Sequence, residues 1–303
     1  MKLKDKLNNK VIPVNKSTGI TTFDCVRKFK SFSKIKKAGH AGSLDPVAEG
    51  LVLLLSGEAT KLSDYLMDLP KKYTADIRLG QSTDTQDTMG EIVSTGEWKG
   101  IGKEEIKDVL PEFLGKRLQV PPMYSALKYK GTPLYKLARK GKKVERKPRE
   151  VRTHEIDLVS CNLPDFKIRV KCSRGLYIRT LAEEIGKRLG VPSHLSGLRR
   201  DAIGNFNVEE AVSPDAFNML DEIESPGYSP AEALAHLPAV EMSKRQSALL
   251  LNGVAPPFPI DMDLSRGDII RLIRFDNTLG GIGEVTRARI IKIRRVLKPA
   301  SRY

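Results

Sequence analysis

A short segment near the N-terminus combines the residue types of a reactive carboxylate loop. It runs Ala38-Gly39-His40-Ala41-Gly42-Ser43-Leu44-Asp45-Pro46-Val47-Ala48-Glu49-Gly50. Its glycines allow tight backbone turns, and Pro46 favours an extended conformation at the preceding Asp45. The segment lacks the Gly-Lys-Ser/Thr ending of a nucleotide-binding loop. The local pattern leaves two interpretations: Asp45 is a reactive carboxylate, or it only caps the next turn.

The histidines and cysteines do not form a metal-binding pattern. The four histidines lie far apart in the sequence, and the three cysteines include no Cys-x-x-Cys pair. Neither has the ligand spacing of a zinc site, so we expect no metal. An odd number of cysteines also favours a reducing, cytoplasmic compartment over a disulfide framework.

The chain carries a large excess of positive charge. Its 303 residues contain 52 Lys and Arg against 37 Asp and Glu, a formal net charge of +15, and 40% are hydrophobic. This composition supplies a folded core and points to a polyanionic partner, most often nucleic acid. A basic surface without a partner is the alternative. No apolar run approaches the ~20 residues of a membrane span, and the first residues lack a signal-peptide pattern.

The densest basic stretch lies between Lys136 and Arg152. Nine Lys or Arg residues stand there against two Glu, and three tyrosines lie at or just before its start. Glycines and a proline predict an exposed loop, in which cations can neutralise phosphates and tyrosines can stack on bases. A solvated charged loop is the alternative. We expect four residues to contact an RNA backbone: Lys142, Lys143, Arg146 and Lys147. The C-terminal residues 287–302 repeat the basic pattern.

Hydrophobic periodicity predicts the elements around these segments. Strands are expected at 11–14, 51–55, 73–79, 92–93, 151–160, 165–172, 268–275 and 285–296. Helices are expected after Thr21 or Thr22 and at 58–67, 104–114 and 177–190. A polar loop is expected at 80–90, and residues 277–283 are expected to separate the last two strands. Because helices and strands often fail to alternate, the pattern predicts an α+β fold rather than a doubly wound sheet. The turn-rich segment 222–230 predicts a boundary before a small, mostly β unit.

Several segments, in order along residues 11–204, resemble the tRNA pseudouridine-55 synthases of the TruB family. The segment from Gly39 to Pro46 is similar to the family's active-site segment. Asn15 and Ser17 depart from the family's usual Asp and Pro, and residues 205–303 match only loosely, around Gly281–Glu284. The other similar segments are Asn15–Thr22, Gly57–Lys61, Lys72-Tyr73, Leu79–Asp87, Pro121–Lys128, Gly175–Leu181 and Leu198–Arg200.

The resemblance implies an α+β pseudouridine synthase fold. Its central sheet would be mixed and mainly antiparallel, flanked by helices and loops. The catalytic domain would span residues 1–225, with a basic RNA-binding insert at about 124–152. A small, mostly β, PUA-like RNA-binding domain would span residues 230–303.

The resemblance also implies an isomerase that converts uridine 55 in the T loop of tRNA to pseudouridine after flipping the base. The reaction breaks the N1–C1′ bond and rejoins the uracil through C5. Nothing is oxidised and no group is lost, so no cofactor and no metal are expected. An ionised carboxylate is required at the sugar, and the resemblance places this role on Asp45, as a nucleophile at C1′ or a base at C2′.

Further catalytic roles follow from the resemblance. Arg179 would be the ion-pair partner of Asp45, because a buried carboxylate must be charge-compensated. Tyr73 would stack on the uracil, and Tyr177 would lie near C5 and assist its proton loss. Each tyrosine also has the alternative of an ordinary core residue.

Four substrate-binding residues are implied in the same way. Asp87 would hold Arg179 from the side opposite Asp45, and Leu198 would pack against the flipped base. His40 would fill the gap left by the extruded nucleotide, with a plain loop histidine as the alternative. Lys16 lies in the first of the similar segments.

The expected partner is the T stem-loop of tRNA, bound by a monomer without a membrane or an obligatory protein partner. Two other functions compete. An RNA-binding or tRNA-folding protein would use the same basic segments, but it would not need a charged Asp45–Arg179 pair in a pocket. A catalytic subunit that depends on a guide RNA is the other, and the basic insert favours the stand-alone type.

Overall fold

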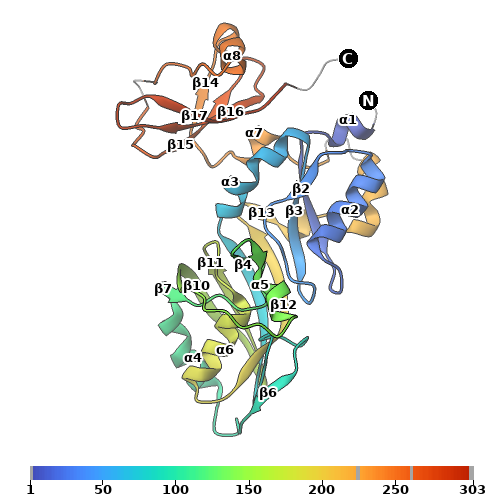
Figure 1. Cartoon of the computed structure of the whole chain (residues 1–303), viewed down its shortest axis with the longest axis vertical. Coiled ribbons are helices and arrows are strands. Elements are labelled where there is room, and N and C mark those ends of the chain that lie inside the picture. Colours follow the sequence, from blue (N-terminus) through green and yellow to red (C-terminus); the bar gives the residue numbers. More distant parts are fainter. Residues whose placement is uncertain (1–2, 223–225, 260–261, 300–303) are drawn as a thin grey trace.

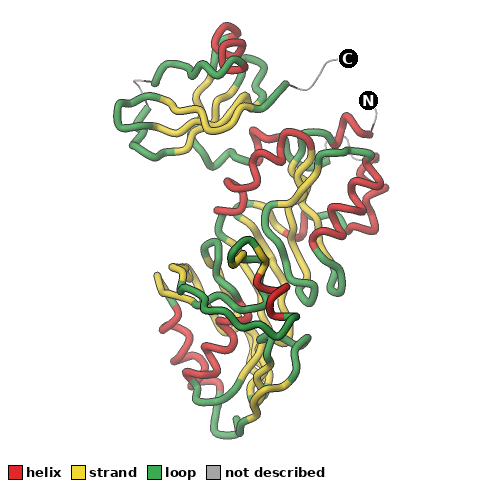
Figure 2. The backbone as a smooth tube through the Cα atoms, in the orientation of Figure 1, coloured by secondary structure: helices red, strands yellow, loops and turns green. Residues whose placement is uncertain are grey.

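The computed structural model describes residues 3–222, 226–259 and 262–299, and a nine-stranded sheet forms its main body (Figure 1, Figure 2). The strands run along an elongated molecule with helices packed at both sides. They are β1 (Val11–Lys16), β2 (Ala38–His40), β3 (Glu49–Ser56), β4 (Lys71–Leu79), β7 (Gly115–Gln119), β10 (Arg149–Asn162), β11 (Asp165–Cys172), β12 (Ser193–Ile203) and β13 (Phe206–Asn207).

The strand order of the main sheet is β1-β3-β12-β4-β11-β10-β7, with β2 paired to β3 and β13 paired to β12. Only the short contact between β12 and β3 is parallel, and the other pairs are antiparallel. The prediction of an α+β fold with a mixed, mainly antiparallel central sheet is therefore confirmed.

Helices cover the sheet at both ends (Figure 1). Helix α2 begins after Thr21, one of the two predicted positions, and Thr21 and Asp24 form a capping box there. The helix buries Val26 and Phe29. The helices of the main body are α1 (Leu3–Leu7), α2 (Thr22–Ser33), α3 (Ser63–Asp68), α4 (Lys103–Val109), α5 (Leu134–Ala138) and α6 (Ile178–Arg188), with 3₁₀ segments η1 (Gly57–Leu62), η2 (Leu110–Phe113), η3 (Val208–Glu210) and η4 (Pro214–Asp221).

A separate four-stranded sheet forms the C-terminal part, with strand order β14-β15-β16-β17. Two short hairpins, β5–β6 and β8–β9, extend from the main body. Their bounds are β5 (Gln81–Thr83), β6 (Ile92–Thr95), β8 (Lys128–Tyr129) and β9 (Thr132–Pro133); the C-terminal elements are α7 (Pro230–Ala233), β14 (Ala239–Glu241), α8 (Lys244–Leu251), β15 (Ile269–Ile273), β16 (Leu279–Val285) and β17 (Ile291–Val296).

The predicted strand 285–296 is correct over 291–296 only, and the predicted connection 277–283 is wrong. The structure has two strands there, β16 and β17, joined by a turn after Val285. The glycines of β16 suggested a loop, but they allow close strand packing: a Cβ on Gly281 would lie 2.6 Å from the carbonyl oxygen of Arg295. Of the predicted boundary 222–230, residues 223–225 lie outside the described residues, as does Arg302 of the basic C-terminus.

Strand β3 organises the core because both of its faces are buried, as its apolar sequence predicts. Val52 and Leu54 pack in the same cluster as Phe29 of α2. Leu51, Leu53 and Leu55 belong to a second cluster that continues into the C-terminal sheet through Ile282. The loop that leads into β3 is therefore attached to the most buried strand of the molecule. Within the described residues, no helix is long and apolar enough to cross a membrane.

Candidate active site

Asp45 lies in the loop between β2 and β3, and that loop is fixed at several points. The Thr22 hydroxyl accepts a hydrogen bond from the Leu44 N–H at 2.9 Å, and the Ala48 N–H donates to the Asp45 carbonyl at 3.1 Å. The Asp45 side chain remains 41% exposed. The loop therefore presents a carboxylate to solvent from a rigid backbone.

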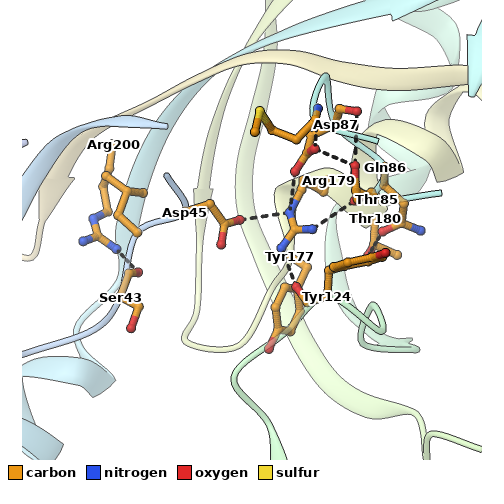
Figure 3. Close-up of polar contacts among 12 residues, drawn as sticks. Ser43, Asp45, Thr85, Gln86, Asp87, Tyr124, Tyr177, Arg179, Thr180 and Arg200 are labelled. Atoms are coloured by element: carbon orange, nitrogen blue, oxygen red, sulfur yellow. Dashed lines mark hydrogen bonds and ion pairs between the residues drawn. The ribbon is translucent and has the colours of Figure 1, made fainter. Parts of the chain in front are cut away.

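Arg179, in the first turn of α6, joins this carboxylate to a second loop (Figure 3). Its Nε donates to Oδ2 of Asp45 at 2.9 Å and lies 3.5 Å from Oδ2 of Asp87. Its two other nitrogens donate to the backbone carbonyls of Thr85 and Tyr124, at 2.9 and 2.8 Å. The guanidinium is 5% exposed, and all of its nitrogens have partners. A buried cation satisfied in this way compensates the Asp45 charge in a fixed orientation.

A pocket of about 370 Å³ opens beside Asp45, a volume suited to a small ligand. Tyr73 reaches it from β4, Tyr177 from the N-cap of α6 and Leu198 from β12. Burial raises the pKa of both Tyr73 and Tyr177, so their phenols are even harder to ionise than that of an exposed tyrosine. The pocket thus combines an exposed carboxylate with flat and apolar walls that can hold a ring.

Four basic side chains line the pocket although the sequence predicted no role for them: Lys71, Arg149, Arg174 and Arg200. Burial lowers the pKa of Lys71 to about 8, and two backbone carbonyls accept from its amine. A signal existed for Arg200, which belongs to the similar segment Leu198–Arg200, and for Arg149, which belongs to the basic insert. Nothing in the local sequence distinguishes the buried Lys71 from lysines on the surface.

Arg200 fixes the carboxylate loop from the side opposite Arg179 (Figure 3). It is 2% exposed and donates to the backbone carbonyls of Leu51 at 2.6 Å, Ser43 at 3.1 Å and Gly42 at 3.4 Å. The backbone of Gly50 comes so close that a Cβ there would lie 2.4 Å from the Arg200 carbonyl oxygen. This packing ties the loop to β12.

His40 and Lys16 lie outside the pocket lining. His40 ends β2, its Nδ1 is buried without a partner in the described structure, and burial followed by the Arg200 charge lowers its pKa. Lys16 is fully buried at the end of β1, and its amine donates to the carbonyls of Ser17, Ile20 and Ala48. Burial lowers the Lys16 pKa to about 8. The structure therefore points the Lys16 amine at backbone carbonyls.

The basic insert at about 124–152 contains the β8–β9 hairpin, α5 and the start of β10. Its four named residues lie in the loop between α5 and β10 and differ in exposure. Lys142, Lys143 and Lys147 are exposed. Arg146 is half-buried, and its Nη1 donates to the Pro121 carbonyl at 3.0 Å. Three of the four side chains are thus free to meet a polyanion. In the part of the chain that the structure describes, no cluster of three His, Cys, Asp or Glu could hold a metal.

The chain is similar to known proteins in both sequence and fold. Residues 30–178 match the model of the TruB family pseudouridylate synthase N-terminal domain. The tRNA pseudouridine synthase B of Geobacter sulfurreducens is 39% identical over 272 residues, which cover 87% of this chain and 89% of that protein. The tRNA pseudouridine synthase B of Clostridium tetani is 38% identical over 289 residues, which cover 94% of this chain and 99% of that protein. The fold is similar to that of a chain in the crystal structure of a Cbf5–Nop10–Gar1 complex, with a TM-score of 0.76 and 24% sequence identity. The match covers 99% of this chain and 87% of that chain.

Proposed function

The chain belongs to the TruB family and is a tRNA pseudouridine synthase, and from this premise we propose that it modifies uridine 55 in the T loop. The observation that carries the proposal is the Asp45 carboxylate, held by Arg179 at the mouth of a ring-sized pocket. A protein that only bound or folded tRNA would gain nothing from burying the Arg179 cation against this carboxylate, because a buried charge is costly and must be compensated.

Asp45 acts at the ribose of the target nucleotide. It either attacks C1′ or removes the C2′ proton, and both routes require the ionised carboxylate. The N1–C1′ bond breaks, the uracil rotates, and a C5–C1′ bond forms. C5 then loses its proton and N1 gains one, so atoms and charge balance without an oxidant or a reductant.

The pocket walls hold the flipped uracil. Leaving the base stack costs a few kcal/mol, which stacking and apolar contact in the pocket offset. Tyr73 and Leu198 supply these contacts, and Tyr177 assists removal of the C5 proton. His40 takes the place of the extruded nucleotide, Asp87 supports Arg179, and Lys16 holds the backbone next to the pocket.

The basic insert and the C-terminal unit bind tRNA. Lys142, Lys143, Arg146 and Lys147 contact the backbone of the T stem-loop, with Arg146 also anchoring the insert. We assign residues 1–225 to catalysis and 230–303 to a PUA-like RNA-binding domain. The enzyme works as a monomer in the cytoplasm, without a guide RNA, partner protein, metal or cofactor.

The test uses the purified chain and an unmodified tRNA transcript. Pseudouridine should appear at position 55 without any added protein, RNA or metal, as mapped by carbodiimide modification and primer extension. A transcript with cytidine at position 55 is the matched control and should give no product. Pseudouridine at another position, or binding without any product, would contradict the proposal.

A further inference from the structure

Gln86 occupies a special position in the loop that follows β5. Its neighbours on both sides contact Arg179: the Thr85 carbonyl accepts from Nη1, and the Asp87 carboxylate faces Nε. Gln86 itself has a φ of 66°, in the left-handed region that costs a side chain other than glycine free energy. Such a conformation persists only where the surrounding contacts hold it.

The side chain of Gln86 supplies such contacts, and it reaches the same helix that carries Arg179. Its Oε1 accepts from the Thr180 hydroxyl at 2.8 Å, and its Nε2 donates to Glu183. The Gln86 carbonyl accepts from the Leu195 N–H at 3.0 Å, which ties the loop to β12. The turn is therefore attached to α6 through the Gln86 side chain, as Figure 3 shows for Thr180, and to the central sheet through its backbone.

The conformation of the turn determines which carboxylate oxygen of Asp87 faces Arg179. Oδ1 of Asp87 accepts from the Thr85 hydroxyl at 2.6 Å and from the Met89 N–H at 3.0 Å. The other oxygen, Oδ2, is left to face Arg179. With residue 86 left-handed, the carbonyl before it and the carboxylate after it both point at one guanidinium.

We infer that Gln86 is a positioning residue for the isomerisation. Its amide links the left-handed turn to Thr180 and Glu183, so that Thr85 and Asp87 hold Arg179 with Nε directed at Asp45. This inference rests on the proposed function, since it assumes that the Asp45–Arg179 pair carries the chemistry. Gln86 does not line the pocket.

The first test compares Gln86→Ala with Gln86→Gly. Both remove the amide, but only glycine adopts the left-handed conformation freely. We expect both variants to slow single-turnover pseudouridine formation by at least about tenfold with unchanged tRNA affinity, because small misplacements of catalytic groups are that costly. Gly should recover thermal stability relative to Ala without recovering rate. If Gln86→Gly reacts at the wild-type rate, the amide has no positioning role and the inference is overturned.

The second test exchanges the partners. Gln86→Glu places a carboxylate beside Glu183 and should be as slow as Gln86→Ala. Adding Glu183→Gln restores the hydrogen bond between the two side chains with donor and acceptor exchanged. The amide introduced on α6 would donate to the carboxylate introduced in the turn, and the Thr180 hydroxyl could still donate to that carboxylate. We expect the double variant to regain at least half of the lost rate on a logarithmic scale. Failure to regain rate in a folded double variant would contradict the inference.

Two controls separate the possible failures. Thr88→Ala changes an exposed residue of the same loop and should leave the rate unchanged. Asp45→Asn reports on the proposed function itself. If Asp45→Asn is inactive while Gln86→Ala reacts normally, only the inference fails; if Asp45→Asn is active, the proposed function fails as well.

Discussion

Arg179 uses all of its nitrogens inside the protein. They contact two carboxylates and two backbone carbonyls, on segments that are far apart in the sequence. Only a planar guanidinium has enough donors in the right directions to serve this set. The proposed catalytic carboxylate thus depends for its orientation on one side chain from another element.

We expect Arg179→Lys to slow single-turnover product formation by at least about a hundredfold, with little change in tRNA affinity. Lysine keeps the charge but loses the planar fork that joins Asp45 to Asp87, and breaking a buried pair such as Arg179–Asp87 typically costs ~3–5 kcal/mol. The matched control is Arg188→Lys on the same helix, whose pair with Glu112 is exposed and worth only ~0–1 kcal/mol. A near-normal rate for Arg179→Lys, or a loss confined to affinity, would indicate that Arg179 contacts phosphate instead.

Some site residues could be predicted from sequence and others could not. Asp45 and Arg179 stand in segments whose residue types and order resemble a known family. The carbonyls of Thr85 and Tyr124 are backbone groups, so their contacts with Arg179 depend on conformation and leave no trace in residue type. Lys71 likewise becomes a pocket residue only because β4 turns it inward.

At the scale of elements, strands with a regular hydrophobic pattern were predicted from the sequence, and strands with an interrupted pattern were not. The apolar run at 51–55 predicted a strand buried on both faces, and β3 is one. β12 escaped prediction because two register shifts, after Leu195 and after Arg200, interrupt the alternation that marks a strand. The buried Arg200 also resembles a surface residue in sequence. Its burial is possible because backbone carbonyls satisfy it, which is a tertiary property.

The basic insert is expected to bind phosphate through its exposed lysines. Replacing Lys142, Lys143 and Lys147 with Gln should flatten the dependence of tRNA affinity on salt. Each lost contact should reduce the log–log slope by about 0.9 on duplex or about 0.7 on single-stranded RNA. Filter binding over a salt series measures this slope.

Two comparisons make the insert experiment specific. Lys99→Gln with Lys103→Gln changes two exposed lysines outside the insert and should leave the slope unchanged. Arg146→Gln should alter the slope less than any single lysine change, because Arg146 is directed at the Pro121 carbonyl. An unchanged slope in the triple variant would mean that the insert is only a solvated loop.

At the scale of the molecule, Glu58 connects the C-terminal sheet to the main body. It accepts hydrogen bonds from Lys37, Lys61 and the backbone N–H of Lys298, and Lys61 also donates to the Val296 carbonyl. Partial burial alone would raise the pKa of Glu58, but these hydrogen bonds outweigh it and lower the pKa to about 2. The carboxylate is therefore more easily ionised in the folded than in the unfolded chain.

This shift predicts a pH dependence of stability. A folded pKa below the unfolded value of 4.5 stabilises the fold fully above that pH and progressively less as pH falls towards about 2. Glu58→Gln should therefore lower the free energy of unfolding at pH 7, and the difference from wild type should shrink below pH 4.5. Urea unfolding at several pH values measures it. Asp64→Asn, which removes an exposed partner of Arg295, is the control and should change little; an equal loss at every pH for Glu58→Gln would contradict the account.

The most direct test of the central claim is the single-turnover rate of Asp45→Asn on an unmodified tRNA transcript. Asparagine keeps nearly the same shape but cannot supply the negative charge that both proposed routes require. We expect the rate, followed by tritium release from C5-labelled uridine, to fall below about one percent of wild type, a loss of more than ~2.7 kcal/mol in barrier stabilisation. Affinity for tRNA should stay within a few-fold. Turnover above that level, with the variant correctly folded, would remove Asp45 from the chemistry and contradict the proposed mechanism.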